Sequence, residues 1–313
     1  MKENQASFTA MSAAYMRAYH SIDATDKIFD DFLAYDLISE EKRVRIEQHL
    51  IEQYVTWDQQ LRNPENIASF SNMITISESL MQATHKWGGL LNSRARYVED
   101  ALDKAIRQGV KQYVILGAGM DTFAFRQPEM MEHLEVFEVD HPATQKFKLQ
   151  RLAELEWEHP AKLHFIPIDF TKESLVTALT CSSSYDPNVK SFFSWLGVTP
   201  YLTQEEVFST LRSITKIAPM DSTIVFDYFD TDAFISEKSS PQMQKSVEYL
   251  RKLGEPMKSR GFNPSNLAEE LASLEFSLQE NLSPKDIEKY YFKGRTNGYH
   301  AYEHGHFACA VIK

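Results

Sequence analysis

The 313-residue chain has only two cysteines, Cys181 and Cys309, which lie far apart in the sequence. Neither has partners at the spacing of metal ligands, which argues against a cysteine-based metal site. Scarce cysteine also fits a reducing compartment, so we expect a cytoplasmic protein. Three histidines near the end of the chain, His300, His304 and His306, have no matching acids or cysteines in a ligand pattern. We interpret them as surface or loop histidines, and we expect no metal site.

Long apolar runs and an excess of basic residues are also missing. No run of about 18 apolar residues occurs, and the start of the chain has no apolar core followed by a cleavage site. We therefore expect neither a membrane-spanning helix nor a secretion signal. The chain has 33 basic and 44 acidic residues and a formal net charge of −11. Because such a field repels nucleic acids and anionic membranes, we expect neither as a partner.

What the sequence does contain is enough apolar material for a large core. Hydrophobic residues make up 43% of the chain and charged residues 25%, which is typical of a globular enzyme. A length of 313 residues is near the upper limit of one domain. We expect a single α/β domain in which an N-terminal helical cap, residues 1–90, adjoins a catalytic core, residues 91–313. The oligomeric state stays open, a homo-oligomer included.

The most informative stretch of the sequence is residues 111–140. A short apolar run, Tyr113–Leu116, predicts a strand that is buried on both faces, and it stops at Gly117-Ala118-Gly119. Two glycines allow the backbone to turn tightly and to approach a ligand closely. A second predicted strand, Leu134–Val139, ends at Asp140. At about 20 residues beyond the glycines, this carboxylate is well placed to bind ribose hydroxyls, which indicates a ligand that contains a nucleoside.

Two nucleoside cofactors compete for this pattern. A dinucleotide site usually has a third glycine where this chain has Thr122, and an acid such as Asp121 is a poor neighbour for a pyrophosphate. The same acid suits a cofactor with an ammonium and a sulfonium group, as in S-adenosylmethionine. An NAD(P)-dependent oxidoreductase and a non-catalytic protein that binds a nucleoside cofactor remain as alternatives.

Four blocks of sequence then occur in order: residues 93–97 (SRARY), 109–126 (GVKQYVILGAGMDTFAFR), 136–148 (VFEVDHPATQKFK) and 195–203 (WLGVTPYLT). This set resembles the bacterial S-adenosylmethionine-dependent methyltransferases that are related to leucine carboxyl methyltransferases and polyketide O-methyltransferases. The resemblance implies a class I methyltransferase fold, a Rossmann-like, mostly parallel sheet with helices on both faces, and S-adenosylmethionine as methyl donor. It does not imply a particular acceptor.

The resemblance also implies roles for single residues. In the family, the arginine that matches Arg94 holds the carboxylate of the cofactor, and a basic residue near Arg17 closes over it. The family match favours binding of adenine by Asp169 and Phe170, although this acid could also cap the turn that follows. Leu196 stands where many relatives have a glutamate that contacts the cofactor. The predicted cofactor-binding residues are therefore Arg17, Arg94, Gly117, Ala118, Gly119, Asp121, Asp140, Asp169, Phe170 and Leu196.

The acceptor side is less defined. Tyr201, Asp227 and Tyr228 follow or end predicted strands and could touch an acceptor, but each could equally be plain structure. A carboxylate acceptor arrives ionised and needs no base, whereas a phenol would benefit from one. We predict an O-methyltransferase that acts on a small molecule or an exposed carboxylate or hydroxyl group.

The remaining patterns predict the other elements. Apolar periodicity predicts helices over residues 7–20, 40–60, 67–84 and 90–108, and Thr203 with Glu206 predicts a capping box. Two loops separated by a helix, around residues 230–264, suggest a lid. Late strands over residues 275–280 and 307–312 are expected to join the sheet as antiparallel neighbours.

Overall fold

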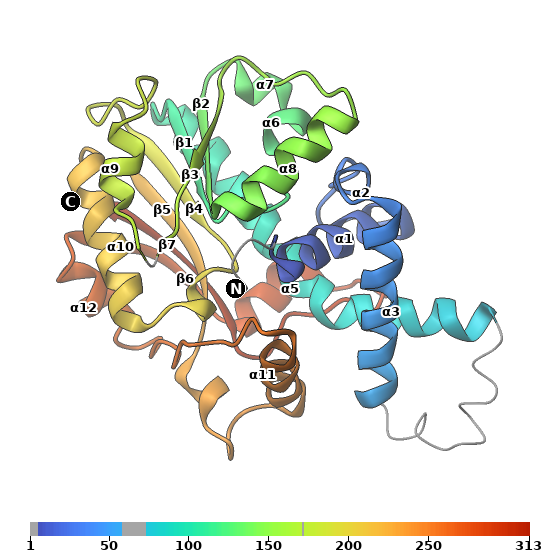
Figure 1. Cartoon of the computed structure of the whole chain (residues 1–313). Coiled ribbons are helices and arrows are strands. Elements are labelled where there is room, and N and C mark those ends of the chain that lie inside the picture. The colour runs from blue at the N-terminus through green and yellow to red at the C-terminus, as the bar shows by residue number, and fades with distance from the viewer. Residues whose placement is uncertain (1–5, 58–72, 171) are drawn as a thin grey trace.

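A seven-stranded sheet forms the centre of the computed structural model, which describes residues 6–57, 73–170 and 172–313 (Figure 1). Its strands follow the order β3-β2-β1-β4-β5-β7-β6, and every pairing is parallel except those of β7 with β5 and β6. The predicted class I methyltransferase fold and its late antiparallel strands are confirmed. The strands are β1 (Gln112–Leu116), β2 (Glu135–Asp140), β3 (Leu163–Pro167), β4 (Ser191–Trp195), β5 (Thr223–Phe229), β6 (Phe276–Leu282) and β7 (Gly305–Ile312).

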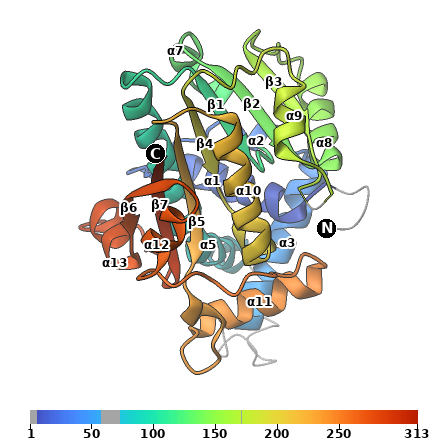
Figure 2. The same ribbon diagram turned by 90° about the vertical axis from the view of Figure 1, so that its left-hand side faces the viewer.

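Alternate residues of the central strands belong to two hydrophobic cores, one on each face of the sheet. Tyr113 and Ile115 of β1 belong to one core, and Val114 and Leu116 belong to the other, because successive side chains of a strand point to opposite faces. The second core is covered by α9 (Leu175–Thr180), α10 (Gln204–Ile217) and α12 (Leu267–Ala272), which lie in front of the sheet in Figure 2. The expected capping box begins α10 at Thr203.

The other face carries the longest helix that the structure describes, α5 (Met73–Arg107). Two shorter helices, α6 (Phe123–Arg126) and α7 (Pro128–Met131), join it on this face, and α8 (Pro142–Glu154) packs beside β3. The strand order reverses between β1 and β4, since the chain moves outward from β1 in both directions. In open α/β sheets this reversal creates a crevice at the carboxyl ends of the strands, where ligands bind.

A separate cluster of helices lies beside the sheet, at the right of Figure 1. It consists of α1 (Phe8–Asp23), α2 (Ala34–Leu37), α3 (Glu40–Trp57) and the first part of α5, which share a third apolar core. The prediction of separate helices over 67–84 and 90–108 was wrong, because α5 is continuous through residues 85–89. The expected end at Gln60 and the expected start at Ile67 lie outside the described residues.

Close packing explains why two adjacent glycines occur inside α5. A Cβ atom at Gly88 would lie 2.5 Å from the ring of Tyr299, and one at Gly89 would lie 1.9 Å from the carbonyl oxygen of His300. The glycines therefore let the segment before β7 lie directly against the helix, at a helix-propensity cost of about 1 kcal/mol each. The boundary expected at residue 90 falls inside this continuous helix.

The segment between β5 and β6 contains the loops and helix that the sequence predicted. After η4 (Thr231–Phe234), α11 (Pro241–Leu253) ends at Gly254, which has a left-handed backbone with φ of 81°. Two short turns, α13 (Pro284–Ile287) and η5 (Glu288–Phe292), lead from β6 toward β7, and η3 (Thr199–Tyr201) follows β4. In the described parts of the chain, no helix has the length and apolar character needed to cross a membrane.

Candidate functional site

A cavity of about 640 Å³ lies at the carboxyl ends of the central strands, between the sheet and the helical cluster. All ten predicted cofactor-binding residues line it, and so do Tyr201 and Asp227. Tyr228 does not: its ring is buried, stacks on His306 and donates a hydrogen bond to Asn281 at 2.9 Å. Of the two roles left open for Tyr228, these contacts support plain structure, because adjacent residues of β5 point to opposite faces of the sheet and Asp227 is the one that faces the cavity.

The turn after β1 forms the floor of the cavity. Gly117 and Gly119 have φ angles of 75° and 55°, a region that favours glycine. A Cβ atom at Gly117 would lie 2.3 Å from a methyl carbon of Val198, so the position has no room for a side chain. The backbone of this turn is consequently bare toward the cavity.

Asp140 is fixed against this turn from the end of β2. Its carboxylate accepts hydrogen bonds from the backbone N–H of Gly119 and, at 2.5 Å, from that of His141. Burial raises the pKa of Asp140 above its ordinary value, although the two backbone donors oppose the shift. The side chain is partly exposed and lines the cavity, so its remaining lone pairs can accept from a ligand.

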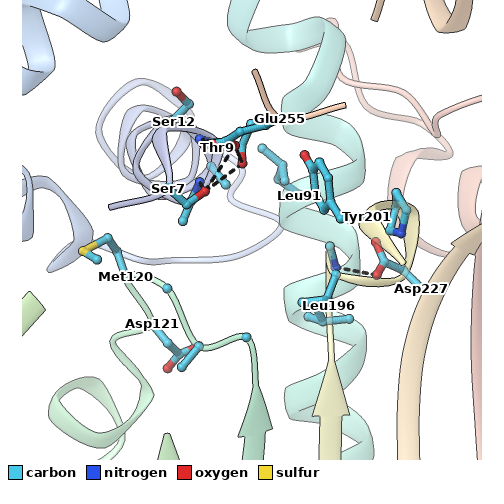
Figure 3. Close-up of a pocket in the computed structure, with 18 of the residues that line it drawn as sticks. Ser7, Thr9, Ser12, Leu91, Met120, Asp121, Leu196, Tyr201, Asp227 and Glu255 are labelled. Atoms are coloured by element: carbon cyan, nitrogen blue, oxygen red, sulfur yellow. Dashed lines mark hydrogen bonds between the residues drawn. The ribbon is translucent and has the colours of Figure 1, made fainter. Parts of the chain in front are cut away.

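Arg94 of α5 and Asp227 of β5 form an ion pair beside the cavity, with 2.6 Å between Nη1 and Oδ2. The other oxygen of Asp227 accepts from the backbone N–H of Gly197 at 2.6 Å (Figure 3). A Cβ atom at Gly197 would lie 2.7 Å from Nη2 of Arg94, so the guanidinium packs directly on this glycine. The sequence predicted both residues for the site but placed them in different roles, since 133 positions separate them.

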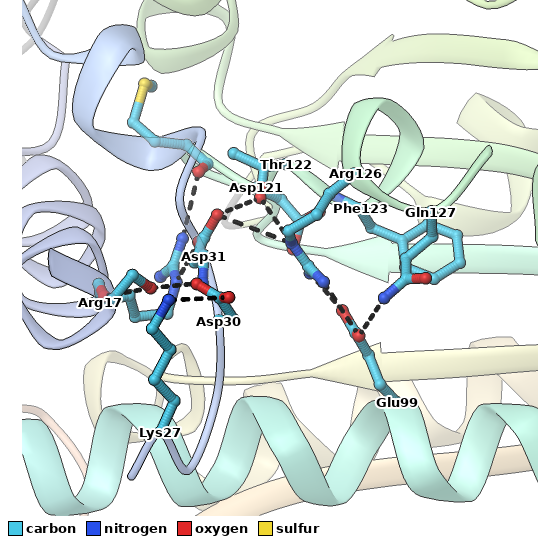
Figure 4. Close-up of polar contacts among 12 residues, drawn as sticks. Arg17, Lys27, Asp30, Asp31, Glu99, Asp121, Thr122, Phe123, Arg126 and Gln127 are labelled. Carbon is cyan, nitrogen blue, oxygen red and sulfur yellow. Dashed lines mark hydrogen bonds and ion pairs between the residues drawn. The ribbon is translucent and has the colours of Figure 1, made fainter. Parts of the chain in front are cut away.

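Arg17 of α1 joins a second polar network near the glycine turn (Figure 4). Its Nε donates to the buried carboxylate of Asp31 at 2.8 Å, and its Nη2 donates to the carbonyl of Met120 at 3.2 Å. Asp31 also accepts from the hydroxyl of Thr122 and lies 3.7 Å from Nε of Arg126. The network connects α1 to the turn that follows β1, and Asp31, which lies at its centre, was not among the predicted site residues.

Asp121 is held by backbone contacts. Its side chain accepts from the N–H of Phe123 at 2.7 Å, and its carbonyl accepts from Nζ of Lys148 at 2.5 Å. Lys148 is paired in turn with Glu138 of β2, and both side chains are almost fully buried. Burial raises the pKa of Glu138, although Lys148 opposes the shift. This buried pair stabilises the turn through the bond from Lys148 to the carbonyl of Asp121, and sequence reasoning missed it.

Asp169 and Phe170 follow β3 at another side of the same cavity. The carboxylate of Asp169 lies 3.2 Å from Nζ of Lys172 and 3.9 Å from Nε2 of His141. His141 caps α8 by accepting from the N–H of Ala143 at 3.2 Å. Leu196 lines the cavity at the end of β4 and packs against the first apolar core, so this position offers only apolar surface.

The first turn of α1 closes part of the cavity and is bound by a residue that sequence reasoning missed, Glu255. Its carboxylate accepts from the backbone N–H groups of Phe8 at 3.0 Å and Thr9 at 3.3 Å, and from the hydroxyls of Thr9 and Ser7 (Figure 3). Tyr201 lines the cavity in the same region, and burial raises the pKa of its hydroxyl to about 12. A lone glutamate after Gly254 carries no sequence signal for this contact.

The histidines near the end of the chain differ in their surroundings. His300 is exposed and His304 lies in the turn before β7, in line with the predicted surface or loop positions, although His304 is buried. His306 lies within β7 and is buried, so its assignment to the surface or to a loop was wrong. His304 and His306 contact the carboxylate of Asp230, at 2.9 Å and 3.4 Å, because β7 runs antiparallel to β5 and brings them to the end of that strand. Among the described residues, no group of three or more His, Cys, Asp or Glu side chains could hold a metal ion.

Comparison with known proteins gives this geometry a context. A family model described as leucine carboxyl methyltransferase matches residues 10–215. A protein of Bacillus subtilis, YktD, described as a candidate S-adenosyl-L-methionine-dependent methyltransferase, is 38% identical over the full length of both chains. A Mycobacterium tuberculosis relative of the same description is 31% identical over 51% of this chain and 46% of its own.

Solved structures agree on the fold. A DUF574 family protein from Streptomyces avermitilis has a TM-score of 0.53 at 13% identity, covering 76% of this chain and 91% of its own. A candidate methyltransferase from Thermobifida fusca has a TM-score of 0.51 at 13% identity, with 84% and 94% covered.

Proposed function

This chain belongs to the leucine carboxyl methyltransferase family and is an S-adenosyl-L-methionine-dependent methyltransferase, and from this premise we propose that it methylates an oxygen atom of a small molecule. The observation that carries the proposal is the single cavity lined by every residue that the sequence assigned to the cofactor. Its floor is bare backbone, and the first turn of α1 lies over it. Residues 1–90 act in this proposal as a helical cap over the reaction.

The residues of the cavity fit the cofactor part by part. Asp140, fixed by two backbone donors, binds the ribose hydroxyls, and Asp169 with Phe170 binds the adenine. The turn from Gly117 through Ala118 to Gly119 has no side chain larger than a methyl group, so the rest of the cofactor can approach its backbone closely.

Three other residues bind the charged end of the cofactor. Arg94 uses one guanidinium nitrogen for Asp227 and has further N–H groups for the carboxylate of the cofactor. Arg17 approaches the same region from α1, and Asp121 offers a carboxylate for the ammonium group. Leu196 offers apolar contact at the position where many relatives have a glutamate. The cofactor therefore meets one carboxylate fewer in this chain than in those relatives.

The cofactor supplies a methyl group on a positively charged sulfur, and the protein supplies alignment and a dry environment. The walls that exclude water are α1, α3 and α5, together with residues 249–258. Tyr201 and Asp227 lie within reach of the cavity. Asp227 is already engaged with Arg94 and Gly197, so it positions the arginine instead of acting on the acceptor. We propose a carboxylate or a hydroxyl oxygen as the acceptor, of which the description of the family names the carboxyl group.

Calorimetry tests the cofactor assignment. S-adenosylhomocysteine is expected to bind saturably at one site per chain, whereas NADP is expected not to bind. Saturable binding of NADP alone would overturn the proposal. Incubation of the protein with isotopically labelled donor and a pooled metabolite extract then tests catalysis, since a methylated oxygen is expected in the product and methylation of nitrogen or carbon would contradict it.

A further inference from the structure

The cavity continues beyond the predicted cofactor residues into a chamber bounded by α3, α5 and α11. One face of α3 lines it through Ile46, His49, Leu50 and Gln53, which follow helical spacing. We propose that this chamber is the acceptor subsite and that it takes an apolar molecule bearing a hydroxyl group, with His49 accepting the hydroxyl proton and Gln53 binding the polar head. The inference rests on the proposed function and specifies its acceptor.

His49 has a fixed orientation and a defined tautomer in the neutral ring. Its Nδ1 lies 2.9 Å from the carbonyl oxygen of Arg45, one helical turn earlier. Because a carbonyl oxygen can only accept, Nδ1 carries the hydrogen and Nε2 has the free lone pair. The ring also packs against Phe8 of α1, with 5.1 Å between ring centroids. Nε2 is therefore a hydrogen-bond acceptor available to a ligand of the cavity.

Gln53 is the second polar group of the chamber. The residue is only 7% exposed and lines the cavity, so the part of its side chain that remains accessible can contact a ligand there. A carboxamide offers two N–H donors and a carbonyl acceptor, so it can bind the polar group of a ligand. It lies four residues beyond His49 on the same helical face, where one ligand can contact both.

The rest of this chamber is mainly apolar. Leu50, Leu91 and Leu250 are nearly buried and line the cavity from three helices, and Trp87 and Leu253 add further apolar surface. Two nearby hydroxyls are already committed: Ser12 donates to the carbonyl of Phe8 at 2.9 Å, and Thr9 donates to Glu255. The surroundings therefore suit an apolar body that carries one or two polar atoms.

A hydroxyl fits this arrangement better than a carboxylate does. The lone pair on Nε2 needs a donor, which a hydroxyl has and an ionised carboxylate lacks. The carboxylate of Glu255 lines the cavity nearby and would repel a second anion, and Lys258 is directed toward Glu206, at 3.9 Å. The described walls of the chamber thus favour a donor group over an anion.

Methyl transfer to the hydroxyl oxygen needs an acceptor for the hydroxyl proton, and His49 is the proposed acceptor. When the hydroxyl oxygen forms its bond to the methyl carbon, the electron pair of the broken carbon–sulfur bond stays on sulfur. The hydroxyl proton passes to Nε2 of His49 and then to solvent. A positioned base of this kind typically contributes about 100- to 10,000-fold to a rate.

Binding of a matched pair of probes tests the inference. The full-length protein is saturated with S-adenosylhomocysteine and titrated calorimetrically with 2-naphthol and with 2-naphthoate, which share one apolar body. The 2-naphthol is expected to bind at least about tenfold more tightly than the 2-naphthoate. Equal affinities, tighter binding of the carboxylate, or no binding of either would overturn the inference. Failure of S-adenosylhomocysteine to bind would instead refute the proposed function.

Variants then separate the two residues. Gln53→Leu is expected to weaken 2-naphthol binding at least about fivefold and to leave S-adenosylhomocysteine binding unchanged. Gln48→Leu, the same change on the exposed side of α3, is the matched control and should alter neither. His49→Ala is expected to slow methylation of 2-naphthol at least about 100-fold. Unchanged binding in Gln53→Leu, unchanged turnover in His49→Ala, or bound 2-naphthol that the parent protein fails to methylate would contradict the assigned roles.

Discussion

At the scale of single residues, Asp140 is a predicted ligand of the ribose that lines the cavity and is held by two backbone N–H groups. Replacing it with alanine removes the proposed acceptor for ribose hydroxyls and leaves the N–H of Gly119 without its partner. We expect Asp140→Ala to weaken S-adenosylhomocysteine binding by about 1–3 kcal/mol, measured by calorimetry. Asp103→Ala, a change in an exposed pair on α5, should have no effect. An unchanged affinity in Asp140→Ala would remove this residue from the site.

Arg94 permits a sharper test, because a smaller ligand lacks the group that it is proposed to bind. We expect Arg94→Ala to weaken S-adenosylhomocysteine binding by about 1.5–3 kcal/mol but to leave binding of 5′-methylthioadenosine, which has no carboxylate, almost unchanged. Arg96→Ala is the control, since Arg96 is half exposed and pairs with Asp100.

The loss of binding in Arg94→Ala could have two causes, and a second variant at its partner Asp227 distinguishes them. Removing the arginine leaves Asp227 buried without its counter-ion, so a loss could arise from that charge alone. The double variant with Asp227→Ala removes both charges. If it restores S-adenosylhomocysteine binding to the parental affinity, Arg94 does not bind the carboxylate of the cofactor.

At the scale of elements, the first turn of α1 is held by Glu255, whose carboxylate accepts from the N–H of Phe8. These two residues lie 247 positions apart in the chain. The carboxylate satisfies backbone donors that a helix start otherwise leaves to water. We expect Glu255→Gln to increase hydrogen exchange of the amides over residues 8–12 and to speed dissociation of S-adenosylhomocysteine, since this turn covers the cavity. Exchange by mass spectrometry and stopped-flow dissociation measure the two effects.

A control for this prediction lies on the neighbouring helix. Glu248→Gln removes an exposed glutamate that pairs with Lys252 at 2.8 Å within α11. It should change neither exchange nor dissociation. Equal protection of α1 in Glu255→Gln and in the parent would show that Ser7, the N-cap residue, holds the turn without the carboxylate.

At the scale of the whole molecule, Asp230 joins three parts of the chain. It directly follows β5, contacts His304 just before β7 and His306 within β7, and forms an isolated β-bridge with Phe262 after α11. Burial acts to raise the pKa of Asp230, but hydrogen bonds from the two histidines outweigh it and hold the pKa below its ordinary range. A lowered pKa means that folding favours the ionised form.

The sign of the pH effect follows from this direction. An aspartate whose pKa is lowered by folding stabilises the protein above its unfolded value of about 3.9, and that stability is lost as the pH falls through the folded value. We expect Asp230→Asn to lower the free energy of unfolding by about 1–3 kcal/mol at pH 6. The difference from the parent should shrink as the pH falls below about 4. Urea denaturation at several pH values measures it, and a difference that grows in acid would contradict it.

The sequence by itself determined the sheet, the turn after β1 and the residues that line its edge, because these follow from short-range patterns. A strand needs a few apolar residues, a bare turn needs glycine, and Asp140 follows its strand directly in the chain. The order of the blocks was also enough to identify the family.

Only the tertiary structure decided which of these residues meet and what else joins them. It joined Arg94 to Asp227, turned Tyr228 away, made one helix of two predicted ones, and brought Glu255 to the start of α1. Such contacts lie between residues that are distant in the chain, and each depends on the packing of whole helices against the sheet. Local periodicity contains no information on that packing, which is why His49 and Gln53 appeared in the sequence only as part of an amphipathic helix.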